Sequence, residues 1–503
     1  MKTSGLGQFK LGQPLPSGTH AVCVSLPKFA DVIGYEEKDP GTLSDMPSGY
    51  PRFVRHQLIQ RMIDHLCVDS VEKTSGYLFA REQDCEQAIK RYQIQDYKTT
   101  HNQDWTLLEL PADSEKNSLI SAYFQHTGCG ISSRLAEDFL WDRGLVEQRE
   151  VLSETPEAES VIKQRISQAH GPEVSADDLL LASSGANAFH ALFKAATEQA
   201  ISKNKSIWIR WGWLYLDTIE VMDLYGKEFG KVLEINAVGN TDELISLFDK
   251  YGNEIAGVVT EFPTNPLLQA GDLELVRKLC DQSGALLIID PTMVSPKNAK
   301  ITSTADVVVN SLTKYAGWEG DVMMGSLAFP KCSKLGKELF LRTEELICPP
   351  YHRDILRMAE QIPFYDHFIE SANKNALQVA EFLENHPGVK KVHWAYQHSF
   401  RSNYEKFAGE NNPGCNLSFE INGDFKKFYD HLEMLKSPSF GTEFSNCCPY
   451  VYLAHYSLIQ TEEGRQKLQD AGIHPELLRL SVGMEGAEKI TAALDLALQY
   501  SRT

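Results

Sequence analysis

The fold of this chain can be predicted from residues 285–317, ALLIIDPTMVSPKNAKITSTADVVVNSLTKYAG, which contain two short apolar runs, each followed by polar residues. The first run ends at Asp290, and Ser311, Thr313 and Lys314 follow the second. Runs that are apolar along their whole length are typical of strands with helices on both faces, which predicts a mostly parallel sheet. In such folds the active site lies outside the carboxyl ends of the strands. The residues after each run are therefore the first candidates for a functional site.

The same alternation of apolar runs and helical stretches extends over much of the central part of the chain. Three more runs, at Leu179–Ala182, Ile207–Ile209 and Ala256–Val259, precede the two described above. Residues 272–284, DLELVRKLCDQSG, have apolar residues at helical spacing and close on a glycine, which predicts a helix with a C-terminal stop. We therefore expect an α/β domain built around this sheet.

The flanking parts of the chain show weaker patterns. Residues 39–53 are rich in turn formers and predict a long ordered loop, and residues 55–71 have the apolar spacing of an amphipathic helix. After residue 356 a long helical pattern is followed by two strand-like pieces, 389–394 and 414–421, and then by an amphipathic helix, 488–501. The C-terminal part is thus predicted to be a smaller α+β domain.

Composition and charge exclude several classes of protein. The chain has 503 residues, of which 42% are hydrophobic and 10% aromatic, and this composition excludes global disorder. Its 49 basic and 68 acidic residues give a formal charge of −19, which argues against nucleic acid or an anionic membrane as the main partner. No apolar run of membrane-spanning length and no signal peptide is found. The ten cysteines lack paired spacing, so we expect a cytoplasmic enzyme with reduced thiols and no metal site.

Small residues follow the first strand of the predicted sheet. Ser184, Gly185 and Ala186 come after Leu179–Ala182 and open a predicted helix. The free backbone N–H groups at a helix start form a site for an anion such as a phosphate, although an ordinary turn before a helix cap gives the same pattern. Asp290 at a buried strand end needs a cation or several donors, unless it is itself a cap or turn residue.

The combination of these features is more specific than its parts. A phosphate cradle, an acid and a lysine at successive strand ends of one sheet are the parts that a pyridoxal phosphate (PLP) enzyme needs. In such a site Lys314 binds the cofactor as a Schiff base and Asp290 keeps the pyridine nitrogen protonated. The sequence thus predicts a PLP site at the carboxyl edge of the sheet.

Five motifs, in the same order along the chain, resemble those of the Cys/Met-metabolism PLP enzymes, which include cystathionine γ-synthases, cystathionine lyases, methionine γ-lyases and O-acetylhomoserine sulfhydrylases. The motifs are EFPTNPLL (261–268), LLIIDPT (286–292), SLTKYAGWEGD (311–321), HPGVKKVHW (386–394) and LLRLSVGMEGAEKI (477–490). Stretches in the N-terminal part resemble the long fungal-type cystathionine γ-synthases, namely HAVCVSLPKFADVIGYEEKDP (20–40), SGYPRF (48–53) and QHTGCGISSR (125–134). The resemblance then covers nearly the whole chain.

The resemblance implies an architecture as well as a cofactor. It implies the PLP-dependent transferase fold type I, with a three-layer α/β/α large domain at residues 136–355 that binds PLP and a smaller α+β domain at residues 356–503. Residues 1–135 would form an extended N-terminal segment that contributes to the dimer and to the active site. The family pattern further implies a homodimer or homotetramer that acts on small amino-acid substrates.

Carried over residue by residue, the resemblance implies that Lys314 is the Schiff-base lysine and Asp290 the partner of the pyridine nitrogen. It puts Asn265 near the phenolic oxygen of the cofactor. Arg479 and Ser439 would bind the substrate carboxylate, for which a bidentate guanidinium is the expected donor. The phosphate would be held by Ser184, Gly185, Ala186, Ser311 and Thr313.

The chain departs from the family pattern at two functional positions. In the Tyr-x-Arg clamp that a partner subunit donates to the phosphate, Tyr123 is present but Gln125 replaces the arginine, and Arg134 is a nearby candidate for the lost charge. The tyrosine expected to stack on the cofactor falls at Trp211, which cannot relay a proton. Tyr215 or Tyr123 is then the candidate acid for the leaving group.

The resemblance implies chemistry at the γ carbon of an amino acid. The cofactor acidifies the Cα proton, Lys314 removes it, and the γ leaving group departs. The implied activity is γ-replacement on an activated homoserine ester, with cysteine giving cystathionine. Trp211 and the sequence WEGD (318–321), which replaces the usual GHxD, leave room for γ-elimination or γ-replacement on a specialised γ-substituted amino acid, for example a γ-halo amino acid. A non-catalytic PLP-fold regulator is the alternative of another class.

Overall fold

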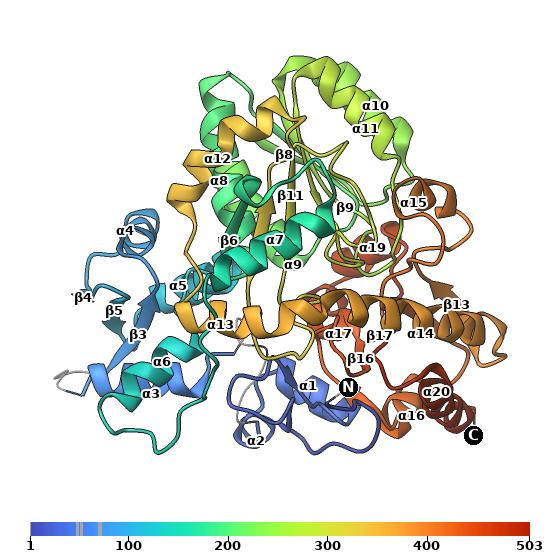
Figure 1. The fold of residues 1–503 in the computed structure, drawn as a ribbon, viewed down its shortest axis with the longest axis horizontal. Helices are drawn as coiled ribbons and strands as arrows, with labels where there is room; N and C mark the ends of the chain where they lie inside the picture. Colours follow the sequence, from blue (N-terminus) through green and yellow to red (C-terminus); the bar gives the residue numbers. More distant parts are fainter. Residues whose placement is uncertain (1, 47–49, 51–53, 69–72, 503) are drawn as a thin grey trace.

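The computed structural model describes residues 2–46, 50, 54–68 and 73–502. Its largest sheet has seven strands in the order β6-β12-β11-β10-β9-β7-β8 (Figure 1). Strand β12 is antiparallel to both of its neighbours, and the others run parallel. In chain order, strands β6 to β12 are Leu179–Ala182, Ile207–Trp211, Lys231–Ile235, Ile255–Glu261, Leu286–Asp290, Val307–Ser311 and Gly325–Ala328. The five apolar runs of the sequence are therefore confirmed as strands of one mostly parallel sheet.

Helices cover both faces of this sheet, which is why its strands are apolar along their whole length. Neighbouring strand residues such as Leu180 and Leu181 belong to the two different cores on either side. One core includes residues of α8 (Gly185–Ser202), α9 (Leu216–Phe229) and α12 (Lys334–Leu346). The other includes residues of α7 (Ala158–His170), α10 (Thr241–Tyr251), α11 (Leu273–Ser283), α13 (His352–Gln361) and the start of α14 (Tyr365–Asn385).

Helix α11 confirms the helix predicted at residues 272–284. Asp272 caps its first turn by accepting a hydrogen bond from the backbone N–H of Leu275 at 3.1 Å. Gly284 follows the last turn with a φ of 60°, a left-handed conformation that favours glycine. This stop turns the chain directly into β10, and so brings Asp290 to the carboxyl edge of the sheet.

The C-terminal part contains a second sheet of five strands, in the order β13-β14-β17-β16-β15. In chain order, strands β13 to β17 are Val389–His393, Asn416–Ile421, Leu435–Lys436, Asn446–Pro449 and Leu478–Ser481. The predicted strand pieces and closing helix are confirmed as β13, β14 and α20 (Ala487–Ser501). Further helices in this part are α15 (Arg401–Ala408), α16 (Phe425–His431), α17 (Tyr450–Ala454), α18 (Tyr456–Gln460) and α19 (Glu462–Asp470).

The N-terminal part has more regular structure than the sequence predicted. It contains a three-stranded antiparallel sheet in the order β3-β5-β4, which was missed because the strands are short and β4 is largely exposed. The strands are β3 (Thr74–Phe79), β4 (Lys98–His101) and β5 (Thr106–Pro111). The helices beside them are α3 (Gln57–Leu66), α4 (Glu82–Arg91), α5 (Lys116–Thr127) and α6 (Ser133–Trp141). Helix α3 confirms the helix predicted from residue 55 but ends at Leu66, and residues 69–71 lie outside the described residues.

Residues 2–46 pack against the C-terminal sheet and its helices (Figure 1). Helix α1 (Phe29–Glu36) packs in one core with α14, α16 and α20, and the short strands β1 (Pro14–Leu15) and β2 (Cys23–Val24) pair with each other. The predicted loop at 39–53 begins with a short helix, α2 (Pro40–Ser44). Of this loop, residues 47–49 and 51–53 lie outside the described residues.

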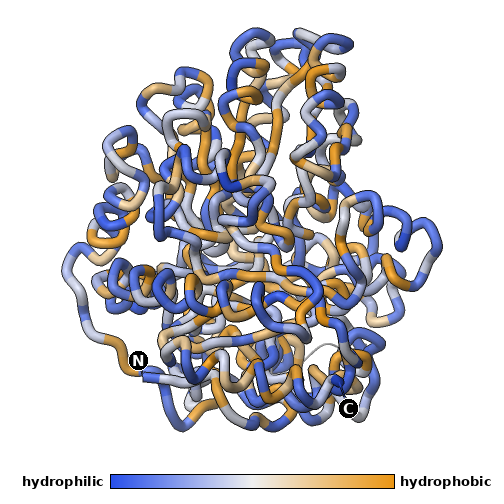
Figure 2. Tube along the Cα trace, turned by 90° about the vertical axis from the view of Figure 1, so that its right-hand side faces the viewer, coloured by the Kyte–Doolittle hydropathy of each residue, from blue (hydrophilic) through white to orange (hydrophobic). Residues whose placement is uncertain are grey.

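The distribution of hydropathy follows the layers. Figure 2 shows hydrophobic stretches running through the interior and hydrophilic stretches at the outer turns. Within the described ranges, no helix is long and apolar enough to cross a membrane.

Candidate active site

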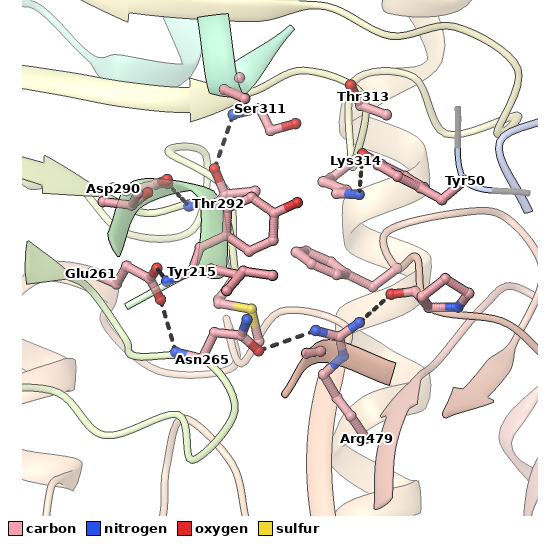
Figure 3. A pocket seen from close by; sticks show the side chains of 18 of the residues that line it. Tyr50, Tyr215, Glu261, Asn265, Asp290, Thr292, Ser311, Thr313, Lys314 and Arg479 are labelled. Carbon is pink, nitrogen blue, oxygen red and sulfur yellow. Dashed lines mark hydrogen bonds between the residues drawn. The ribbon is translucent and has the colours of Figure 1, made fainter. Parts of the chain in front are cut away.

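A pocket lies at the carboxyl ends of β9, β10 and β11, between the large sheet and the C-terminal sheet (Figure 3). Glu261, Asp290 and Ser311 are the last residues of these three strands, and all three line the pocket. Arg479 enters from β17 of the C-terminal sheet. Because parallel strands end at the same edge of a sheet, residues far apart in the sequence converge here.

Lys314 lies just beyond the end of β11 and is 8% exposed. Its ammonium donates hydrogen bonds to the hydroxyls of Ser439 at 3.2 Å and Tyr50 at 3.3 Å. It also lies over the rings of Tyr50 and Phe440, with distances of 4.8 and 5.0 Å to the centroids. Among the described residues, no carboxylate pairs with it. A buried amine held by neutral groups is suited to react with a carbonyl rather than to balance an acid.

Two acids stand side by side at the ends of neighbouring strands. Glu261 of β9 is in register with Asp290 of β10. Burial and the adjacent Asp290 charge raise the pKa of Glu261 well above its ordinary value, whereas burial raises the pKa of Asp290 to about 6. The backbone N–H of Thr292 donates to the Asp290 carboxylate at 2.8 Å. At neutral pH we therefore assign the proton of the pair to Glu261 and the negative charge to Asp290.

The start of α8, where the sequence predicts an anion cradle, lines the pocket. Ser184 caps this helix, and its hydroxyl accepts from the backbone N–H of Asn187 at 3.1 Å. A Cβ on Gly185 would lie 2.8 Å from the Cβ of Ser311, so glycine is what lets the helix start approach the end of β11. Ala186 and Thr313 complete the cradle at the same side of the pocket. The first N–H groups of a helix have no partner within it and can bind an anion.

Arg479 offers a cation on the other side of the pocket. It is 6% exposed, donates to the side-chain oxygen of Asn265 at 3.1 Å and to the backbone oxygen of Pro438, and lies over the rings of Phe440 and Tyr450. In the part of the chain that the structure describes, it forms no ion pair with a carboxylate. Its charge is therefore available for an anionic ligand in the pocket.

These features fit PLP. The cofactor has an aldehyde for the amine of Lys314, a ring nitrogen that binds a proton for the Asp290 carboxylate, and a phosphate for the start of α8. Within the described ranges, Asp290 pairs with no cationic side chain, so a buried negative charge lacks the partner that a protonated ring nitrogen would supply. The close approach that Gly185 permits gives the cradle its shape.

The expected stacking position of Trp211 is wrong. Trp211 is fully buried in the core behind the sheet and does not line the pocket, because its side chain points to the face covered by α7 and α11. Its indole packs so closely on Gly271 that a Cβ there would lie 2.5 Å from the ring. Tyr215, at the start of α9, lines the pocket, and its backbone N–H donates to Glu261 at 2.5 Å. Of Trp211 and Tyr215, only Tyr215 therefore lines the pocket.

Replacing Trp211 by phenylalanine tests this correction. We expect the variant to keep its cofactor content and KM, and to lose about 2 kcal/mol of stability because the smaller ring leaves a gap in the core. Urea unfolding and the visible spectrum of the cofactor measure the two effects. A loss of cofactor affinity with unchanged stability would show that Trp211 contacts the cofactor after all.

Tyr123 does not line the pocket of its own chain. It is 2% exposed and lies on α5 between the rings of Tyr92 and His190, at centroid distances of 6.1 and 6.2 Å. Gln125, two residues later, borders a separate cavity that also includes His126. Neither side chain reaches the phosphate cradle of its own chain.

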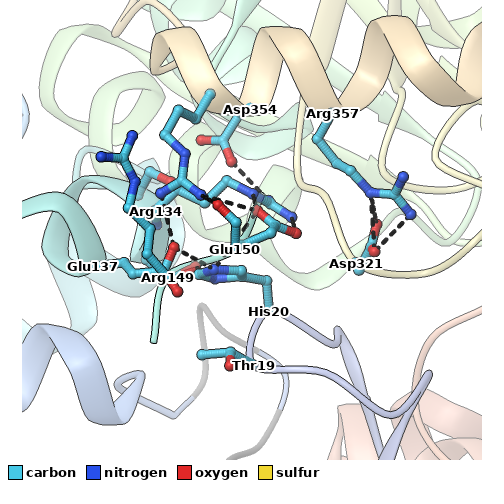
Figure 4. A network of polar contacts seen from close by, with 12 residues as sticks. Thr19, His20, Arg134, Glu137, Arg149, Glu150, Asp321, Asp354 and Arg357 are labelled. Atoms are coloured by element: carbon cyan, nitrogen blue, oxygen red, sulfur yellow. Dashed lines mark hydrogen bonds and ion pairs between the residues drawn. The ribbon is translucent and has the colours of Figure 1, made fainter. Parts of the chain in front are cut away.

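Arg134 binds acidic side chains outside the pocket (Figure 4). Its guanidinium binds Glu150 with two hydrogen bonds of 2.6 and 2.9 Å and Asp354 with a third of 2.9 Å. The charge is thus neutralised by acids outside the pocket and does not replace the missing clamp in this chain. The two acids of the motif WEGD (318–321) are also paired, because Glu319 and Asp321 both accept hydrogen bonds from Arg357.

Sequence reasoning missed several pocket residues, of which four bear on the chemistry of the site. Glu261 and Thr292 follow predicted strands, so the rule that located Asp290 could have found them. Phe440 adjoins the predicted Ser439. Tyr50 could not be predicted as a pocket residue, because nothing in its local sequence indicates that it contacts a lysine 264 positions later.

Comparisons with known proteins agree with this site. The chain matches the family model of the Cys/Met metabolism PLP-dependent enzymes over residues 157–499. It is 32% identical over 485 residues to an L-2-amino-4-chloropent-4-enoate dechlorinase/desaturase of Streptantibioticus cattleyicolor, covering 95% of this chain and 96% of that protein. It is 26% identical over 626 residues to a cystathionine gamma-synthase of Neurospora crassa, covering 98% and 99%.

A solved structure gives the same result for the fold. The cystathionine gamma synthase of Xanthomonas oryzae in complex with cystathionine has a TM-score of 0.59 at 22% identity, covering 71% of this chain and 88% of that chain. The predicted fold type I and the predicted dependence on PLP are both confirmed. The chain therefore belongs to the Cys/Met-metabolism family of PLP-dependent enzymes, which act on amino acids.

Proposed function

We propose that this enzyme catalyses γ-elimination on a small amino acid whose γ carbon carries a good leaving group, such as a halide. One observation supports elimination over replacement. Within the part of the chain that the structure describes, Lys314 and Arg479 are the only cationic side chains that line the pocket. Arg479 can bind the carboxylate of one amino acid, and a second amino acid, such as cysteine, would bring a carboxylate without a matching cation.

The side chains around the pocket have different roles in the proposed reaction. PLP, when bound, supplies the electron sink that acidifies the Cα proton of the substrate. Lys314 then takes that proton, and Arg479 holds the α-carboxylate so that Cα faces the amine. Asp290 keeps a negative charge at the far end of the site, while Phe440, Tyr450 and their neighbours present apolar surface to the side chain of the substrate. A halide leaves as an anion without a proton donor.

The relative from Streptantibioticus cattleyicolor supports the choice of leaving group. Its name describes a substrate with chlorine on carbon 4, which is the γ carbon of an amino acid, and a reaction that removes it. The alignment covers 95% of this chain, so it includes most of the elements that build the pocket. The apolar wall beside Arg479 is consistent with a chlorinated side chain.

The second candidate is γ-replacement on an activated homoserine ester, with cysteine giving cystathionine. It is supported by the similarity to the cystathionine gamma-synthase of Neurospora crassa. The test is mass spectrometry of products from a panel of γ-substituted amino acids, with and without cysteine. γ-Elimination predicts the same products and rate in both arms, whereas cystathionine formed only with cysteine would establish replacement.

Arg479 should set the requirement for an α-carboxylate in either reaction. We expect Arg479→Lys to raise KM on the order of 30-fold, equivalent to about 2 kcal/mol, because lysine keeps the charge but loses the two-pronged donor. Steady-state kinetics measure KM, and the visible spectrum checks that cofactor is retained. Unchanged kinetics would move the carboxylate site elsewhere.

A further inference from the structure

The N-terminal segment brings a phenol to the reacting lysine of its own chain. Tyr50 is 6% exposed and lines the pocket, and its hydroxyl lies 3.3 Å from the Lys314 ammonium. Figure 3 shows it reaching Lys314 from the side opposite Asp290 and Thr292. Tyr50 and the acid pair therefore lie on opposite sides of Lys314.

Described residues before and after Tyr50 contact two different parts of the molecule. At the chain start, the backbone N–H groups of Lys2 and Thr3 donate to Glu443 at 2.7 and 2.8 Å. After Tyr50, the His56 ring bonds the backbone oxygen of Thr19 at 2.7 Å. The ring nitrogen of His20, shown in Figure 4, lies 3.4 Å from the carboxylate of Glu137 of α6.

We propose that Tyr50 is a catalytic residue that relays a proton between Lys314 and the γ carbon of the substrate. The inference rests on the proposed γ-elimination. That reaction removes one proton each from Cα and Cβ, and the bond to the γ substituent breaks with its electron pair leaving as the anion. A proton must then be delivered to Cγ, after which a four-carbon substrate is released as an enamine. The enamine takes up a proton at Cβ and is hydrolysed by one water to 2-oxobutanoate and ammonium.

The geometry selects Tyr50 for this task over the other aromatic groups of the pocket. Lys314 has one amine, and Cα and Cγ are separated by two bonds, so a second group that exchanges protons with the amine extends its reach. The Tyr50 hydroxyl is hydrogen-bonded to that amine. By contrast, the Tyr450 hydroxyl lies 3.2 Å from the His455 ring, on the Arg479 side of the pocket.

The test compares Tyr50→Phe with Tyr35→Phe, which removes a phenol from the same segment at a buried position outside the active-site pocket. In Tyr50→Phe we expect kcat for elimination to fall by roughly 10²- to 10⁴-fold, the usual contribution of a general acid–base group. Exchange of the Cα proton with deuterated water should stay within about threefold of the wild type, because Lys314 performs that step alone. In Tyr50→Phe, the amount of 2-oxobutanoate formed with deuterium at C4 should decrease in proportion to turnover. Tyr35→Phe should change none of these values.

A second readout needs neither cofactor nor substrate. In the apoenzyme, Lys314 of Tyr50→Phe should react with acetic anhydride about threefold faster at a fixed pH, because its nitrogen is no longer held by a hydrogen bond to Tyr50. Peptide mass spectrometry measures the label. Incorporating 2,3-difluorotyrosine at position 50 retains the hydroxyl and its shape, and should shift the pH profile of elimination but not that of Cα exchange.

Three results would overturn the role of Tyr50. These are a kcat of Tyr50→Phe within threefold of the wild type, a parallel loss of Cα exchange and turnover, and a pH profile unchanged by the fluorinated residue. Failure of the proposed function has a different signature: cystathionine from added cysteine without 2-oxobutanoate in the wild type. In that case acetylation of Lys314 still reports on its contact with Tyr50.

Discussion

Lys314→Ala is expected to abolish turnover, with a residual rate at least about 10⁴-fold below the wild type, because no other amine lines the described pocket. The purified wild type should be yellow, and borohydride should remove the visible band while fixing a pyridoxyl group on Lys314. Peptide mass spectrometry identifies the labelled residue. The buried, neutral surroundings of Lys314 are the physical reason for this expectation, since its amine is held by hydroxyls and rings and not by a carboxylate.

Lys436 provides a matched control in the same experiment. It is 3% exposed, and burial lowers its pKa to about 8, so its amine is reactive at mildly alkaline pH. It does not line the pocket, and its ammonium donates to the backbone oxygen of Pro27 at 2.6 Å. A pyridoxyl label on Lys436, or turnover by Lys314→Ala, would show that the amine has been misassigned.

Asp290→Ala is expected to lower kcat by at least about 100-fold while the protein keeps part of its cofactor. The carboxylate is the one charge at that end of the described pocket that can hold a proton on the ring nitrogen, whereas the phosphate cradle at α8 does not involve it. Steady-state kinetics and the absorbance of bound cofactor measure the two effects. Full activity in the variant would exclude Asp290 as the partner of the ring.

The pH dependence gives a second check on the same residue. Burial raises the pKa of Asp290 to about 6, so in the apoenzyme its carboxylate is ionised above that pH and protonated below it. Cofactor affinity should therefore fall as the pH decreases through about 6, because a neutral acid cannot pair with a protonated ring nitrogen. Asp290→Asn should remove this dependence, and Glu261→Gln, which changes the neighbouring acid, should retain it.

The sequence alone identified the sheet and the residues at its carboxyl edge. A strand buried on both faces must be apolar along its length, and this pattern is hard to produce by chance. The residue after such a strand is confined to one edge of the sheet, so the pattern of apolar runs is enough to group Asp290, Ser311 and Lys314 in one site. The same rule applies to Glu261, because β9 and β10 end in register. Lys314 and Arg479 also lie in motifs specific enough to identify the family.

Only the tertiary structure could decide between Trp211 and Tyr215. Trp211 is the last residue of β7, and its ring packs in the core on one face of the sheet. Tyr215 comes four residues later, at the start of α9, where it lines the pocket.

The contacts of Tyr50 and Arg134 also could not be predicted from the sequence, because partners such as Lys314 and Asp354 lie far away along the chain. Tyr50 contacts Lys314, a residue 264 positions later in the chain, and Arg134 is instead bound by Glu150 and Asp354. Such contacts depend on how separate units pack together, and local sequence patterns report only the backbone and the face of each element. The sequence therefore determined the strands, the family and the cofactor, whereas packing decided which aromatic and charged side chains reach the pocket.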